Sequence, residues 1–152
     1  MKDELYRQLT KALDIAISAH KGQVDKAGRD YIFHPITVAL ECETTEEKIV
    51  ALLHDTVEDC EQINFVYLET KGFSKEIIDA LKLVTHIKNE NIEDPHEEYR
   101  DYVRKLKASG NKIAINVKLA DLKHNTDTTR LNENKPPKYD DYIWAINYLE
   151  SC

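Results

Sequence analysis

Four ionisable side chains lie next to the most apolar stretch of the chain. His54 and Asp55 directly follow the apolar run 49–53. Glu58 and Asp59 come four residues after them, so on a helix the two pairs would each share a face. Ionisable groups beside a core are unfavourable unless something compensates them, and a divalent cation can bind carboxylate oxygen and neutral imidazole nitrogen together. For His54 and Asp55 the pattern favours a metal site over its alternative, the exposed end of a helix. For Glu58 and Asp59 taken alone, both interpretations stay open.

A second polar stripe surrounds Asp121. Lys118 lies one turn before it, His124 and Asn125 lie one turn after it, and Thr128 follows another turn on. Helical spacing would place these groups on one face of a segment whose other positions are mainly apolar. Taken alone, such a stripe is typical of a solvated helix face.

The elements that must position these residues are helices. Apolar residues recur at helical spacing over residues 5–17, and His34 with Pro35 opens a short helix, because proline is tolerated in a first turn. Thr44 and Glu47 form a capping-box pattern before the helix that carries the first cluster. Further helices are expected over residues 63–70, 74–85 and 113–130, and after residues 94 and 137.

Length and composition fit one domain. The 152 residues are 41% hydrophobic and 32% charged, which is typical of a globular domain. No strand alternation is evident, so we expect a single all-α domain over residues 1–152, a bundle of about seven or eight helices.

Charge and cysteine content restrict the partners and the compartment. The net charge of −7 argues against a nucleic-acid polymer. A small anionic ligand stays compatible with it, because a bound metal ion can dominate the local field. No apolar run approaches the roughly 20 residues that a bilayer requires. The first residues lack the pattern of a secretory leader. The three cysteines, Cys42, Cys60 and Cys152, show no CxxC spacing. The sequence predicts a cytoplasmic protein without a membrane partner.

The candidate ligands and the sequences around them resemble a known family. Their order, His, then His-Asp, then Asp, is that of the HD-domain metal-dependent phosphohydrolases. Residues 20–35 resemble the opening motif of the hydrolase domain of the RelA/SpoT alarmone enzymes, and residues 51–59 resemble its HDxxED helix. Residues 118–125 resemble the last metal-binding helix of that domain. The resemblance covers about residues 1–150 and implies the HD-type helical fold.

The resemblance also implies an activity and a set of site residues. The implied reaction is hydrolysis of the 3′-diphosphate of (p)ppGpp, which releases pyrophosphate and GDP or GTP. The implied ligands of a single ion, Mn²⁺ or another divalent cation, are His34, His54, Asp55 and Asp121. The pair implied to orient and deprotonate the attacking water is Glu58 and Asp59. The residues implied to line the nucleotide side of the pocket are Lys26, Tyr31, Lys118, Asn125 and Thr128.

Two positions depart from the family pattern, and both remove positive charge from the substrate side. Asp25 stands where the family has an arginine that stacks on guanine, and Leu122 stands where its last motif has another arginine. An aspartate cannot stack on a base as a guanidinium does. These departures keep open an HD-type phosphatase for another nucleotide, such as a nucleoside monophosphate or NADPH. A non-catalytic nucleotide-binding module is the third interpretation, although all six ligand and water-activating groups are present.

Overall fold

The computed structural model describes residues 2–129 and 135–151 of the chain, so Cys152 and the predicted helix end at residue 130 lie outside the described residues. Within these ranges the chain forms eight helices and no strand beyond an isolated β-bridge, which confirms the all-α prediction. The helices are α1 (Lys2–Ala19), α2 (Phe33–Glu41), α3 (Thr45–Asp59), α4 (Phe65–Thr70), α5 (Lys75–Val84), α6 (Pro95–Ala108), α7 (Lys112–Asn125) and α8 (Tyr139–Glu150). None of these described helices has the length and apolar character needed to cross a bilayer.

Side-chain caps begin helices at positions that the sequence predicts. The Thr44 hydroxyl accepts a hydrogen bond from the Glu47 N–H at 3.1 Å, and the Glu47 carboxylate accepts one from the Thr44 N–H at 3.3 Å. This reciprocal pair is a capping box, which satisfies two backbone donors that a helix start leaves unpaired. Ser74 caps α5 by accepting a hydrogen bond from the N–H of Ile77. The start of α3, the helix that carries the first cluster, is therefore fixed by local interactions.

The helix that carries Asp121 ends earlier than its periodicity predicts. α7 ends at Asn125, and the carboxylate of Asp127 then accepts a hydrogen bond from the N–H of Thr129 at 3.1 Å. A side chain that bonds to nearby backbone in this way favours a turn over continued helix. Thr128 therefore lies in a turn after α7 and not on its polar face.

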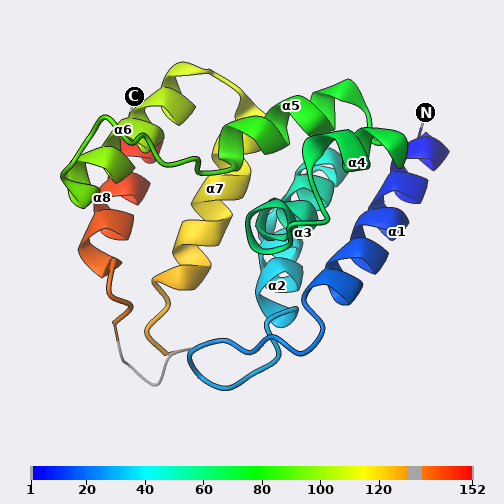
Figure 1. Cartoon of the computed structure of the whole chain (residues 1–152), viewed down its shortest axis with the longest axis horizontal. Helices are drawn as coiled ribbons and strands as arrows, with labels where there is room; N and C mark the ends of the chain where they lie inside the picture. Colours follow the sequence, from blue (N-terminus) through cyan, green and yellow to red (C-terminus); the bar gives the residue numbers. More distant parts are fainter. Residues whose placement is uncertain (1, 130–134, 152) are drawn as a thin grey trace.

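α3 is the central helix of the core. Residues 49–56 are buried without exception. The helix packs against α1, α2, α5 and α7, and α7 packs on its other side against α8 (Figure 1). A helix enclosed on all sides tolerates polar side chains only where partners satisfy them. Three ionisable residues of α3 are buried. Glu47 belongs to the capping box, whereas His54 and Asp55 need partners from neighbouring helices.

Candidate metal centre

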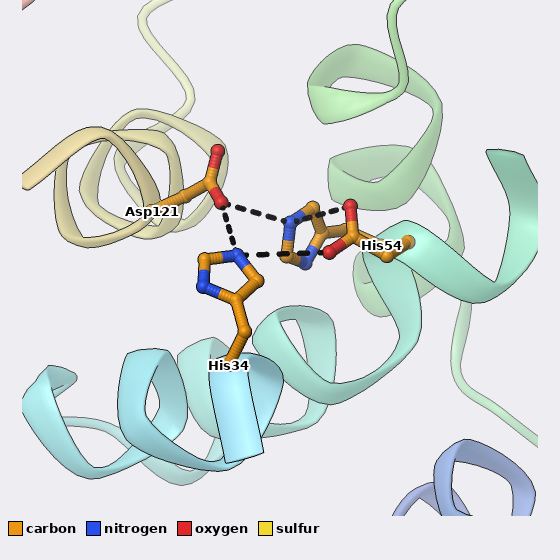
Figure 2. A group of neighbouring side chains, drawn as sticks. His34, His54 and Asp121 are labelled. Carbon is orange, nitrogen blue, oxygen red and sulfur yellow. Dashed lines mark hydrogen bonds and ion pairs between the residues drawn. The ribbon is translucent and has the colours of Figure 1, made fainter. Parts of the chain in front are cut away.

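Three helices bring the four predicted ligands together. His34 lies in the first turn of α2, His54 and Asp55 lie in the second half of α3, and Asp121 lies in α7. Figure 2 shows the side chains of His34, His54 and Asp121 pointing toward one another. All four residues are buried, and one ligand atom from each lies within 4.8 Å of the others. Residues far apart in the sequence thus form one compact polar cluster.

In both histidines the Nε2 atom faces the carboxylates. His34 Nε2 lies 2.8 Å from Asp121 Oδ1 and 3.7 Å from an Asp55 oxygen. His54 Nε2 lies 3.1 Å from Asp55 Oδ1 and 3.4 Å from Asp121 Oδ1 (Figure 2). Two imidazole nitrogens and two carboxylates therefore converge on one small volume.

The donor set fits a divalent cation. His54 Nδ1 lies 2.7 Å from the carbonyl oxygen of Ala51 and donates its hydrogen there, so in the neutral ring the lone pair lies on Nε2. This Nε2 is buried and has no hydrogen bond of acceptable geometry, although Asp55 Oδ1 is close. A buried polar atom without a partner is unfavourable, and a cation would satisfy it together with the carboxylates. The cluster of His34, His54, Asp55 and Asp121 can therefore bind a metal ion.

Both aspartates are ionised, as metal binding requires. Burial by itself raises the pKa of Asp121, but Lys118 Nζ, 3.2 Å from Oδ2, and the two histidines hold that pKa well below its usual range. Burial likewise raises the pKa of Asp55, but the adjacent His54 outweighs it and lowers the pKa to about 2. The cluster thus offers two carboxylates that are anionic at neutral pH.

Two residues predicted to contact substrate are placed against metal ligands. The Tyr31 hydroxyl donates to Asp55 Oδ2 at 2.7 Å. Burial raises the pKa of Tyr31, and the charge of Asp55 raises it further, so the hydroxyl stays a donor. Lys118 is largely buried, with its Nζ beside Asp121 and 5.6 Å from the ring centre of Tyr102. Both side chains therefore support ligands, and Lys118 is not among the lining residues of the pocket described next.

A pocket of about 310 Å³ opens beside His34. Its lining residues are Val24, Asp25, Lys26, Tyr31, His34, Asn125, Pro136 and Tyr142. Three of the predicted substrate-binding residues, Lys26, Tyr31 and Asn125, are thus brought together next to the metal cluster, whereas Thr128 is not among the lining residues. Val24, Pro136 and Tyr142 also line this pocket and were not predicted to do so. In the sequence, Pro136 is part of a helix break and Tyr142 belongs to the apolar face of the last helix.

Glu58 and Asp59 lie at the exposed C-terminal end of α3. Glu58 Oε1 accepts a hydrogen bond from the His86 N–H at 2.9 Å, which ties this carboxyl to the segment after α5. Partial burial raises the pKa of Glu58, although the His86 N–H opposes this, and partial burial together with the charge of Asp55 raises the pKa of Asp59. A carboxylate with a raised pKa is a better proton acceptor.

The fold is the HD-type helical fold. A solved structure of a metazoan ortholog of SpoT, described as hydrolysing ppGpp, matches with a TM-score of 0.74. The match covers 95% of this chain and 86% of that one at 24% sequence identity. This likeness confirms the predicted HD-type bundle.

Relatives in sequence confirm the resemblance to the RelA/SpoT enzymes. The chain is 31% identical over 147 residues to the bifunctional (p)ppGpp synthase/hydrolase SpoT of Escherichia coli (strain K12), covering 91% of this chain and 20% of SpoT. It is 35% identical over 141 residues to the guanosine-3′,5′-bis(diphosphate) 3′-pyrophosphohydrolase of Borreliella burgdorferi, covering 84% of this chain and 20% of that protein. A chloroplastic RSH1 of Oryza sativa subsp. japonica, named as a GTP diphosphokinase, is 32% identical over 151 residues, 91% of this chain and 16% of that protein. The chain thus spans a fifth or less of these relatives' length, and no family model matches it.

Proposed function

We propose that this chain is a metal-dependent hydrolase that removes the 3′-diphosphate of (p)ppGpp as pyrophosphate and releases GDP or GTP. The observation that carries the proposal is a buried cluster of two histidines and two aspartates beside a pocket that contains Lys26 and Asn125. The names of the Escherichia coli and Borreliella relatives include the same activity.

The four clustered residues would hold about one divalent cation per chain. We propose that this ion is Mn²⁺, which the resemblance to the RelA/SpoT hydrolase domain implies. When bound, the ion supplies Lewis-acid polarisation of a phosphoryl oxygen and lowers the pKa of water. The supporting contacts come from the protein: Tyr31 holds Asp55, and Lys118 holds Asp121. These contacts keep the ligands oriented before an ion binds.

The protein groups outside the ligand set supply proton transfer and substrate binding. Glu58 accepts the proton of the attacking water, and its carboxyl is held in place by the His86 N–H. Asp59, one position further on α3, orients the same water. Lys26 supplies positive charge to the phosphates from the pocket wall, and Asn125 supplies hydrogen bonds to the nucleotide.

We further propose that residues 1–152 act as one HD-type domain in the cytoplasm. One hydrophobic core connects residues from Ala12 in α1 to Leu149 in α8. Free thiols at Cys42 and Cys60 suit a reducing compartment. The absence of nucleic-acid and membrane partners stays a prediction.

The direct test of function is hydrolysis by the Mn²⁺-loaded protein of a panel that contains ppGpp, pppGpp, nucleoside monophosphates, nucleoside triphosphates and NADPH. We expect turnover of ppGpp with pyrophosphate and GDP as products, identified by phosphorus NMR. Faster turnover of a nucleoside monophosphate or NADPH would support the HD-type phosphatase instead. Binding of nucleotides without turnover of any would support the non-catalytic module.

The acidic side chain of Asp25 in the pocket lining favours a nucleotide other than ppGpp as substrate. Its Oδ1 accepts hydrogen bonds from the N–H of Ala27 at 2.8 Å and of Arg29 at 3.0 Å, so the carboxylate shapes the loop before α2. The same residue lines the pocket beside His34. A carboxylate at this position places negative charge near the site proposed for a polyphosphate.

Replacing Asp25 with asparagine keeps the oxygen that accepts the loop hydrogen bonds and removes the charge. If ppGpp occupies this pocket, we expect its KM to fall about threefold with kcat unchanged, because charge interactions at partly exposed positions contribute at most about 1 kcal/mol. Steady-state kinetics of Asp25→Asn on ppGpp would show this. Asp25→Arg is the comparison variant, because it changes the charge and also removes both hydrogen bonds to the loop backbone. An unchanged or raised KM in Asp25→Asn would mean that the phosphates do not approach Asp25.

A further inference from the structure

His34 contacts two side chains of α7, one through each ring nitrogen. Its Nε2 lies 2.8 Å from Asp121 Oδ1, inside the metal cluster. Its Nδ1 lies 2.6 Å from Nδ1 of His124, one turn further along α7. His124 is therefore the hydrogen-bond partner of the His34 nitrogen that faces away from the metal cluster.

The hydrogen-bond pattern assigns a role to each nitrogen. A histidine binds a cation through a nitrogen lone pair, and in His34 the nitrogen that faces the carboxylates is Nε2. The hydrogen of neutral His34 must then lie on Nδ1, which donates it to His124 Nδ1. The two ring centres are 4.8 Å apart and the planes differ by 20°. Nearly coplanar rings that meet edge to edge have the geometry of an in-plane N–H···N hydrogen bond.

His124 is not among the residues that line the proposed nucleotide pocket. It lines a separate pocket of about 500 Å³ between α2 and α7, together with Thr37, Glu47 and Asn116. His34, in contrast, lines the pocket that contains Lys26. A side chain in this place can act on the metal ligand without touching the nucleotide.

We infer that His124 is a positioning residue that fixes the tautomer and orientation of His34 for metal binding. This inference rests on the proposed metal site. The contact differs from that of His54, whose Nδ1 is held by the backbone carbonyl of Ala51 and cannot be changed by a side-chain substitution. In His34 the supporting acceptor is a side chain, so it can be removed alone.

Two substitutions at residue 124 separate hydrogen bonding from packing. Asparagine places its Oδ1 where the histidine has Nδ1, so His124→Asn keeps the acceptor for His34. His124→Leu fills similar space and removes the acceptor. Loss of an outer partner of a metal-binding histidine weakens metal affinity by about 10–100-fold. We therefore expect Mn²⁺ affinity about 10–100-fold lower in His124→Leu, and within about threefold of wild type in His124→Asn.

The measurement is calorimetric titration of the chelator-treated full chain with Mn²⁺ alone, without nucleotide. Lys123→Leu, an exposed neighbour on α7 that faces Glu150, is the control and should bind like wild type. Wild-type affinity in His124→Leu, or equal loss in both His124 variants, would overturn the inference. Because no substrate is present, a wild-type chain that binds Mn²⁺ but does not hydrolyse ppGpp would contradict only the proposed function.

Discussion

Replacing Asp121 with alanine is expected to abolish metal binding. Asp121 Oδ1 is the oxygen nearest to His34 Nε2, and it also lies 3.4 Å from His54 Nε2, so one substitution removes the atom common to both histidines. Wild-type protein dialysed against trace Mn²⁺ should contain about one ion per chain by elemental analysis. The variant should contain none above background. Equal metal content in the two proteins would exclude this cluster as the metal site.

The same substitution should lower the stability of the metal-free protein. Lys118 is largely buried and loses its carboxylate partner, and removing one member of a buried pair costs about 3–5 kcal/mol. Urea denaturation of chelator-treated protein would measure this loss. Asp79→Ala is the matched control, because Asp79 pairs with Lys75 at an exposed position and its loss should leave the free energy of unfolding close to that of the wild type.

Replacing Glu58 with glutamine is expected to lower kcat for ppGpp by about 10²–10⁴-fold, the usual contribution of a general base. Glutamine keeps the oxygen that accepts the His86 N–H, so the side chain should stay in place while the proton acceptor is lost. Metal content should be unchanged, because Glu58 is not one of the clustered ligands. Single-turnover kinetics with metal analysis of the same sample would separate the two effects.

The control for this change is Glu69→Gln, an exposed glutamate of α4, which should turn over at the wild-type rate. Asp59→Asn provides the comparison within the site. If Asp59→Asn loses all turnover while Glu58→Gln matches the wild type, then Asp59 is the base and Glu58 has the orienting role.

Local interactions made the starts of the helices predictable from the sequence. The Thr44–Glu47 capping box and the Ser74 cap act over three residues, and both are present in the structure. Periodicity alone was less reliable at helix ends. α7 ends at Asn125, and Asp127 then accepts a hydrogen bond from the N–H of Thr129 in a turn. This turn competes with continued helix, and the spacing of apolar residues does not show it.

The sequence by itself determined which residue types could bind a metal, because His54 and Asp55 sit where a core would otherwise be apolar. Only the tertiary structure decided which group supports each ligand. Tyr31 meets Asp55 across 24 residues, and His124 meets His34 across 90. Such pairs depend on how α2, α3 and α7 pack and have no sequence signal of their own. Capping and periodicity act within one or two helical turns, whereas the distance between two helices is set by all the side chains packed between them.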